Sequence, residues 1–307
     1  MHLLVPFASD DSEACRHVLR DIALPNLARL VARLEPVVRD DGGAASLSPP
    51  HERALAAARG WRGADGALPF AARSAVSDGL LAGDVPWALV TPAHWQLGRD
   101  HATMIDPVQL HLSEADSRAL FGAVRELFES EGFVATWGAP ERWYIGRPEL
   151  QGFATASLDR VIGRNVDAWL GETRSPMGRL VRRLQSEVQL VFHAHPVNES
   201  REARGEAVVN SFWLSGCGRA QASSAAREPV VDDSLRAPLL AGDWAAWGEA
   251  WQAIDAGTLA REGEGLETLT LCGERSAARF AKAATGLLHR LRKRWSAAEP
   301  HSVLEGL

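Results

Sequence analysis

The amino-acid sequence predicts an α/β fold in which a layered, largely buried sheet, mixed or parallel, is flanked by helices. Short apolar runs of strand length alternate with longer segments whose apolar residues recur at helical spacing. Hydrophobic residues make up 46% of the 307 residues, which is enough to bury a sizeable core. No apolar run approaches the roughly 20 residues that a membrane-spanning helix requires. These observations favour a compact α/β protein with no membrane partner.

The individual elements follow from local patterns in chain order. A buried strand at 3–8 opens the fold, and two helices follow, one at 12–22 and one from Pro25, whose fixed φ suits a first helical position. A turn-rich linker is expected at 40–50. The further strands are expected at 85–91, 108–112, 133–137, 142–145, 208–214, 229–232 and 268–272. The further helices are expected at 113–131, 158–162, 175–193, from Asp243, and at 276–295.

The expected domain organisation is two α/β halves that share an interface. We expect an N-terminal half at 1–150, a C-terminal half at 151–295 packed on it, and a flexible tail at 296–307.

The charge and the cysteines indicate compartment and partner class. A formal net charge of −6 gives no electrostatic reason to expect a nucleic-acid binder, since such proteins neutralise many phosphates. The three cysteines follow no metal-ligand or disulfide spacing, which suits reduced thiols. The first residues lack the positive region of a signal peptide. We therefore expect a cytoplasmic location.

A polar segment after the strand at 85–91 is the first candidate for a site. It contains His94, Asp100, His101 and Asp106, whose side chains can bind a metal or titrate near neutral pH. Their spacing matches no compact zinc pattern. The alternative is a loop in which these side chains make structural hydrogen bonds. We expect a site here because ligands of α/β folds gather at strand ends.

The segment 195–218 is the second candidate. His195, Asn198 and Arg201 follow the end of a long amphipathic helix. Capping that helix end is the alternative role for the neighbouring His193, so His195 is the better site candidate. Pro196 is expected to stop that helix.

The end of this segment runs from a strand into a Gly-x-Gly turn. Asn210 and Trp213 lie on the strand, and Gly216 and Gly218 could present backbone N–H groups to an anion. The turn lacks the third glycine of a dinucleotide fingerprint and the lysine of a P-loop, and a tight turn is the alternative. We expect the segments 94–106 and 195–218 to form two walls of one polar cleft.

A tryptophan stripe is the last feature of interest. Trp244, Trp247 and Trp251 recur at i, i+3 and i+7 on a helix capped by Asp243. Such a stripe forms either core or a subunit interface, so a homo-oligomer through this face is one interpretation.

Four segments resemble a known family. Residues 91–107, 157–163, 184–189 and 195–218 resemble proteobacterial regulatory proteins of the Rpf (regulation of pathogenicity factors) E type, which are labelled cofactor-independent phosphoglycerate mutase-like. The label implies an alkaline-phosphatase-like fold with two metal ions, usually manganese or zinc, and a transiently phosphorylated serine.

The expected mutase pattern is mostly missing from this sequence. The N-terminal strand reaches Asp10 and Asp11 without the Asp-Gly metal motif, and Asp100-His101-Ala102 only loosely resembles an Asp-His-Gly triplet. Residues 210–218 resemble an Asn-x-x-Trp-x-x-Gly-x-Gly segment that positions substrate in archaeal-type mutases. The resemblance therefore implies a degenerate relative that kept a ligand pocket.

Two functional hypotheses follow. The first is a regulatory or ligand-binding protein without mutase activity, whose cleft takes a small anionic ligand or a protein partner. The second is a metal-dependent phosphoryl-transfer enzyme of the phosphoglycerate mutase or phosphatase type. In the second, His94, Asp100, His101 and Asp106 would bind manganese or zinc or act as acid and base.

Overall fold

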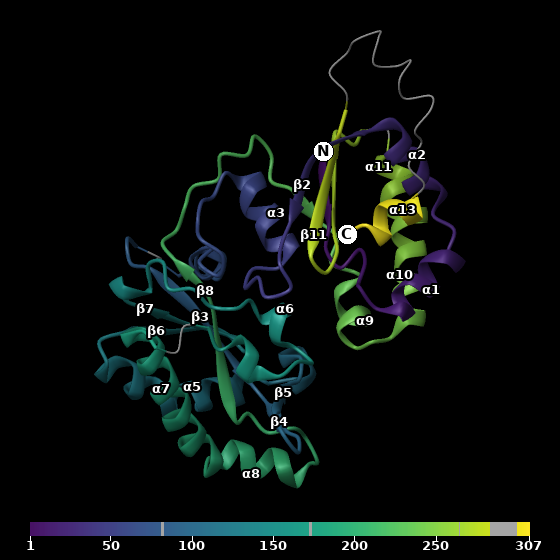
Figure 1. Cartoon of the computed structure of the whole chain (residues 1–307). Helices are drawn as coiled ribbons and strands as arrows, with labels where there is room; N and C mark the ends of the chain where they lie inside the picture. Colours follow the sequence, from purple (N-terminus) through teal and green to yellow (C-terminus); the bar gives the residue numbers. More distant parts are fainter. Residues whose placement is uncertain (81–82, 172–173, 264, 283–299) are drawn as a thin grey trace. The chain divides into compact units, whose positions relative to one another are not determined.

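The computed structural model describes residues 1–80, 83–171, 174–263, 265–282 and 300–307. Its contacts divide the chain into two compact units (Figure 1). Unit 1 contains residues 1–45, 49–60 and 223–307, and unit 2 contains 46–48 and 61–222. This division differs from the expected boundary at residue 150. The reason is that strands from the two ends of the chain pair in one sheet, so the chain returns to unit 1 after completing unit 2.

The sheet of unit 1 has five strands in the order β2-β11-β10-β1-β9. β1 (His2–Val5) pairs in parallel with β10 (Thr268–Cys272) and with β9 (Val230–Val231). β11 (Ser276–Ala281) is antiparallel both to β10 and to β2 (Glu35–Asp41). The sheet is therefore mixed, as the sequence predicts.

Helices cover both faces of this sheet, which confirms the predicted layered α/β class. Leu3 and Val5 of β1 pack into the larger core on one face, whereas Leu4 faces α3 on the other. The helices of unit 1 are α1 (Glu13–Asp21), α2 (Pro25–Arg33), α3 (Pro50–Arg59), α9 (Arg236–Leu240), α10 (Trp244–Ile254), the π-helical turn η4 (Asp255–Leu259), α11 (Ala260–Glu262) and α13 (Pro300–Glu305).

The tryptophan stripe lies on α10 and belongs to the core of unit 1. Trp247 and Trp251 are fully buried. Their indole N–H groups donate to the carbonyls of Phe7 (3.0 Å) and Ala8 (3.1 Å) after β1. The expectation of a homo-oligomer through this face is wrong for these two rings, because they are already covered by their own unit.

The C-terminal region differs from its prediction. Residues 276–281 form the strand β11 rather than the start of a helix, because pairing of this strand with β10 and with β2 outweighs the helix propensity of its alanines. The rest of the predicted helix, at 283–299, lies outside the described residues. Residues 300–307, expected to be a flexible tail, carry Leu304 and Leu307 into the core of unit 1.

Unit 2 is built on a four-stranded antiparallel sheet in the order β6-β7-β3-β8. These strands are β3 (Trp87–Ala93), β6 (Val134–Ala139), β7 (Arg142–Gly146) and β8 (Ser211–Gly218). Ala88 and Val90 of β3 face the larger core of this unit, whereas Trp87 faces the alanines of a short helix, α4 (Phe70–Ser77).

Two long helices supply the larger core of unit 2. α5 (Glu114–Ser130) and α7 (Pro176–His193) begin at the predicted caps, Ser113 and Ser175, whose hydroxyls accept from backbone N–H groups of the first turn. Pro196 does not simply end α7. It is the first residue of α8 (Pro196–Ala203), since proline has no N–H to leave unpaired at that position.

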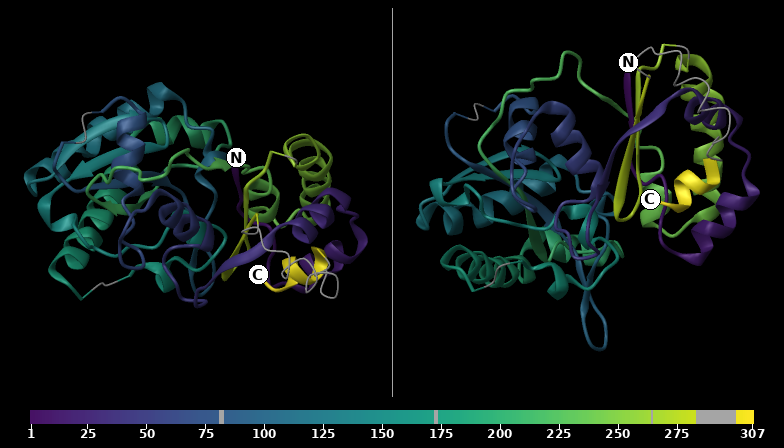
Figure 2. Two further views of the ribbon diagram at one scale, coloured as in Figure 1. Left: turned by 90° about the horizontal axis from the view of Figure 1, so that it is seen from above. Right: turned by 45° about the horizontal axis from the view of Figure 1, so that its top comes forward.

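The segment after β3 departs most from its prediction. Instead of a loop it forms a hairpin of β4 (Trp95–Leu97) and β5 (Ala102–Met104), which projects from unit 2 in the right view of Figure 2. The predicted strand at 108–112 is the 3-10 helix η1 (Pro107–Leu110). The remaining short elements are η2 (Pro148–Leu150), α6 (Leu158–Val161) and η3 (Val166–Trp169). No described helix has both the length and the apolar character needed to cross a membrane.

Candidate functional site

The two predicted walls meet at the base of the β4–β5 hairpin. His94 Nδ1 lies 2.8 Å from the carbonyl oxygen of Val208, which can only accept, so this ring nitrogen carries a proton. The Asn210 side chain bonds both backbone groups of Trp95. Its Oδ1 accepts from the N–H at 2.7 Å, and its Nδ2 donates to the carbonyl at 2.9 Å. Asn210 therefore holds the hairpin against the start of β8.

The four proposed metal ligands lie in different places and do not form one cluster. Asp100 and His101 are exposed at the hairpin tip, while His94 lies at its base. Asp106 is buried and caps η1, accepting from the N–H of Val108. Among the described residues, no group of three or more His, Cys, Asp or Glu side chains could hold a metal ion. The arrangement therefore does not fit manganese or zinc.

Asn198 and Arg201 are buried supports of the backbone. Asn198 donates to the carbonyls of Phe192 (2.8 Å) and Val209 (2.7 Å) and accepts from the N–H of Val209 (2.9 Å). Arg201 donates to the carbonyls of Ala207 (2.8 Å) and Leu110 (2.6 Å). These hydrogen bonds give both side chains a structural role. A ligand-binding role for them stays a prediction.

The remaining predicted site residues also have structural partners. His195 caps α8, its Nδ1 accepting from the N–H of Val197 at 3.2 Å. Trp213 is 3% exposed, and its indole N–H donates to the carbonyl of Ala156 at 2.8 Å.

The Gly-x-Gly turn is shaped by helix packing. Gly216 has a φ of +67°, and a Cβ there would lie 2.8 Å from the backbone nitrogen of Ala71 on α4. A Cβ on Gly218 would lie 3.1 Å from the side chain of Pro69. Close approach of α4 to β8 therefore accounts for both glycines without an anion.

What the two walls enclose is an open groove of about 370 Å³, which we call the hairpin groove. It is lined by Trp95 and Leu97 of β4, Gln189, Leu190, Phe192 and His193 of α7, Asn198 and Glu202 of α8, and Val208 and Asn210 before β8. Leu97 is 85% exposed and Leu190 75% exposed. Of the predicted site residues, only Asn198 and Asn210 line this groove, and most of its exposed lining is apolar rather than polar.

The outer edge of β4 is open beside this groove. The N–H of Gly98 donates to the carbonyl of His101, and the N–H of Ile105 donates to the carbonyl of His94. The backbone N–H and C=O groups of the even-numbered residues 94, 96 and 98 are therefore directed toward β5. Trp95 and Leu97 therefore point their N–H and C=O groups outward. The Asn210 amide occupies those of Trp95. No strand other than β5 pairs with β4 among the described residues, which leaves the Leu97 groups available.

Sequence reasoning missed the two exposed leucines. Leu190 lies outside the apolar stripe of α7. Leu97 lies two residues after Trp95, in a segment that was interpreted as a loop. An apolar residue on the polar side of an amphipathic helix is the signal that would have identified Leu190.

Comparison with known proteins gives no sequence relative. No protein-family model matches the chain, and no curated protein matches it. The cofactor-independent phosphoglycerate mutase from Thermoplasma acidophilum is similar in structure, with 14% identity over 93% of this chain and 90% of that one, at a TM-score of 0.37. The PH0037 protein from Pyrococcus horikoshii shows 12% identity over 92% and 87% of the two chains, at a TM-score of 0.43. Neither likeness decides what the groove does, which follows from its residues.

Proposed function

We propose that this protein is a regulatory binding protein without mutase activity, and that an extended apolar segment of a partner protein docks in the hairpin groove. The observation that carries the proposal is the open edge of β4 at Leu97, next to an apolar groove. A peptide added to a strand edge gains main-chain hydrogen bonds, and neighbouring apolar pockets select its side chains. The regulatory role is the expectation drawn from the resemblance of four sequence segments to Rpf E-type proteins, which no family model supports.

Asn210 prepares this edge for an added strand. Its side-chain amide bonds the outward groups of Trp95 as a neighbouring strand would, so an incoming segment would continue the pairing from Leu97 onward. The same amide fixes the hairpin, so the hairpin loses little conformational freedom on binding.

The lining favours a protein segment over a small anion. Glu202 is acidic, and no lysine or arginine is among the described residues that line the groove, so the lining offers no fixed positive charge to an anion. Leu97 and Leu190 expose apolar surface that a partner would cover, and such surface marks interaction sites. Asn198 and Arg201, which were expected to bind the ligand, donate to backbone carbonyls.

The test is selection from a phage-displayed library of unstructured peptides, followed by titration of the selected peptides with variants. We expect apolar residues at alternate peptide positions. Leu97→Pro removes the outward N–H, and Leu190→Asp places a charge in the groove. Each should weaken binding about tenfold or more, the worth of one to two hydrogen bonds or a buried leucine.

Val108→Asp is the matched control, because Val108 is a 53% exposed apolar residue of unit 2 that does not line the groove. Its affinity should equal that of the unchanged protein. Equal affinity of the Leu97→Pro and Leu190→Asp variants would refute the proposal. So would light scattering that shows a dimer abolished by Leu97→Pro, since the occupant would then be a second copy of this chain.

A further inference from the structure

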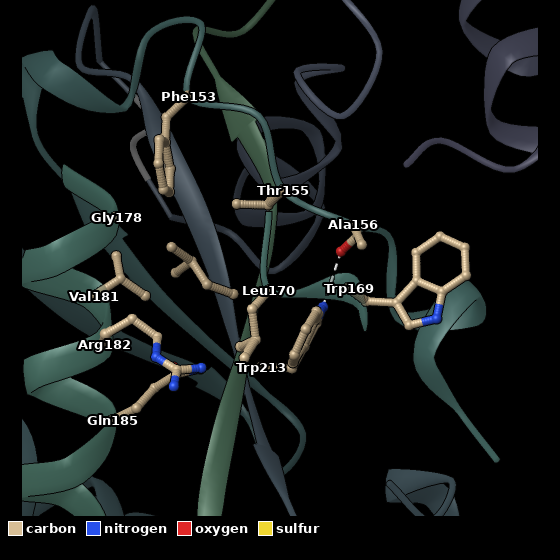
Figure 3. Close-up of a pocket in the computed structure, with 11 residues that line it drawn as sticks. Phe153, Thr155, Ala156, Trp169, Leu170, Gly178, Val181, Arg182, Gln185 and Trp213 are labelled. Carbon is tan, nitrogen blue, oxygen red and sulfur yellow. Dashed lines mark hydrogen bonds between the residues drawn. The ribbon is translucent and has the colours of Figure 1, made fainter. Parts of the chain in front are cut away.

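A second cavity in unit 2 lies at the other end of α7 from the hairpin groove. We call it the Trp213 pocket (Figure 3). Trp213 of β8 forms its floor, α7 forms one side, and Phe153, Trp169 and Leu170 complete the apolar walls. The indole bond from Trp213 to the carbonyl of Ala156 fixes the ring that a ligand would contact.

Gln185 contributes a buried acceptor that no described residue of the protein uses. The residue is 5% exposed, and its Nε2 donates to the carbonyl of Phe212 at 3.3 Å. This bond decides the orientation of the amide, because a flipped amide would set two oxygens against each other. Oε1 is fully buried and has no partner among the described residues. A buried acceptor left unpaired is costly, so a ligand that brings an N–H or O–H group is favoured here.

Arg182 contributes the charge. It lies one turn before Gln185 in the sequence of α7, and its guanidinium points toward Leu170 and Trp213 in Figure 3. No acidic side chain of the described residues pairs with it, whereas its neighbour Arg183 pairs with Glu131 and Glu187. Arg182 is the one charged residue among those described that line the pocket, so the lining favours an anion.

Size and shape limit the ligand further. The pocket volume is only about 20 Å³, which is room for one water-sized group. A ligand can therefore place only a small donor group inside, and its body must lie outside, against the lining side chains. Flat aromatic groups pack well against such walls.

We infer that the Trp213 pocket binds a small aromatic anion that carries an N–H or O–H group, with its carboxylate at Arg182 and its donor at Gln185. This site is separate from the hairpin groove and does not depend on the function proposed for it, since the two share no lining residue.

The test uses three probes of similar size in calorimetric titrations. Indole-3-acetate has the carboxylate and the N–H, 1-naphthylacetate lacks the N–H, and tryptamine replaces the anion by a cation. Indole-3-acetate should bind at least about tenfold more tightly than either of the others, as expected for one charge-assisted or buried hydrogen bond.

Variants assign the two contacts separately. Arg182→Met should weaken indole-3-acetate binding about tenfold or more, while Arg179→Met, on the same helix but outside the pocket, should leave it within about twofold. In Gln185→Met, indole-3-acetate and 1-naphthylacetate should bind alike. The inference is overturned if the unchanged protein does not bind indole-3-acetate at millimolar concentration, if tryptamine binds as tightly, or if Arg182→Met has no effect.

Discussion

The hairpin groove and the Trp213 pocket lie at the two ends of α7, and they use polar side chains in opposite ways. At the groove, Asn198 and Asn210 bond backbone groups of their own unit, and apolar surface is left exposed. At the pocket, the Oε1 of Gln185 has no partner among the described residues, no described acidic side chain pairs with Arg182, and the Trp213 ring at the floor is buried. A polar residue near a cavity therefore indicates a ligand only when the fold does not already use it.

The largest effect in this comparison is expected for the removal of a polar group that the fold uses. Asn198→Leu leaves the carbonyl and the N–H of Val209 unpaired in the core, and it removes one bond from the Phe192 carbonyl, which still accepts from the N–H of His195. The free energy of unfolding, measured in urea, should fall by about 3 kcal/mol. Glu199→Gln, on the exposed side of the same helix, should change it by less than about 0.5 kcal/mol. A loss below about 1 kcal/mol for Asn198→Leu would contradict the structural role.

A smaller effect is expected where the hydrogen bonds are closer to solvent. Asn210→Ala removes two bonds to Trp95 and should lower the free energy of unfolding by about 1–2 kcal/mol. The Trp95 amide should then exchange its hydrogen at least about tenfold faster, because local opening of the hairpin costs less. The exposed residue Gln96 supplies the control as Gln96→Ala. If the Trp95 amide keeps its protection in Asn210→Ala, another contact holds the hairpin.

At the pocket the corresponding change should cost little. Gln185→Met removes one long hydrogen bond together with one unpaired acceptor, so the free energy of unfolding should change by less than about 1 kcal/mol. Leu184→Ala, at the adjacent buried position, should cost about 2–5 kcal/mol and shows that the measurement detects core changes. A loss above about 2 kcal/mol for Gln185→Met would mean that its oxygen is bonded in the folded protein.

The smallest effect is expected for the thiol of Cys217, which lies beside Thr155 (Oγ1 to Sγ, 3.7 Å) at the pocket end of β8. Burial raises the pKa of Cys217 to about 12. We expect no reaction with iodoacetamide in the folded protein at pH 8, measured by mass spectrometry, and full reaction in urea. Rapid labelling would show that solvent reaches farther below the pocket than the structure indicates.

The same raised pKa gives the sign of a pH dependence. The unfolded chain releases the thiol proton near its ordinary pKa of 9, whereas the folded protein retains it. The folded state therefore binds more protons above pH 9, so the stability contributed by Cys217 is complete below this pH and falls as the pH rises toward 12. A Cys217→Ala variant should show a smaller loss of stability between pH 9 and 11.

The sequence alone determined those features that depend on neighbouring residues. The caps Ser113 and Ser175, the stripe of α7 and the apolar run of β10 were each predicted at their observed positions, because capping and burial periodicity are local. The α/β class followed from the alternation of these elements. The meeting of 94–106 with 195–218 was also anticipated, since both follow element ends.

Only the tertiary structure decided the rest. β11 depends on pairing with the distant strand β2, and the β4–β5 hairpin depends on the Asn210 side chain. The local sequence patterns of these two elements therefore gave wrong predictions. Unit 1 is assembled from both chain ends, which no local pattern reveals. The roles of Asn198, Arg201 and Gln185 were decided by their hydrogen-bond partners. All three are buried polar residues, and only the positions of distant backbone groups determine which of their atoms the fold leaves unpaired.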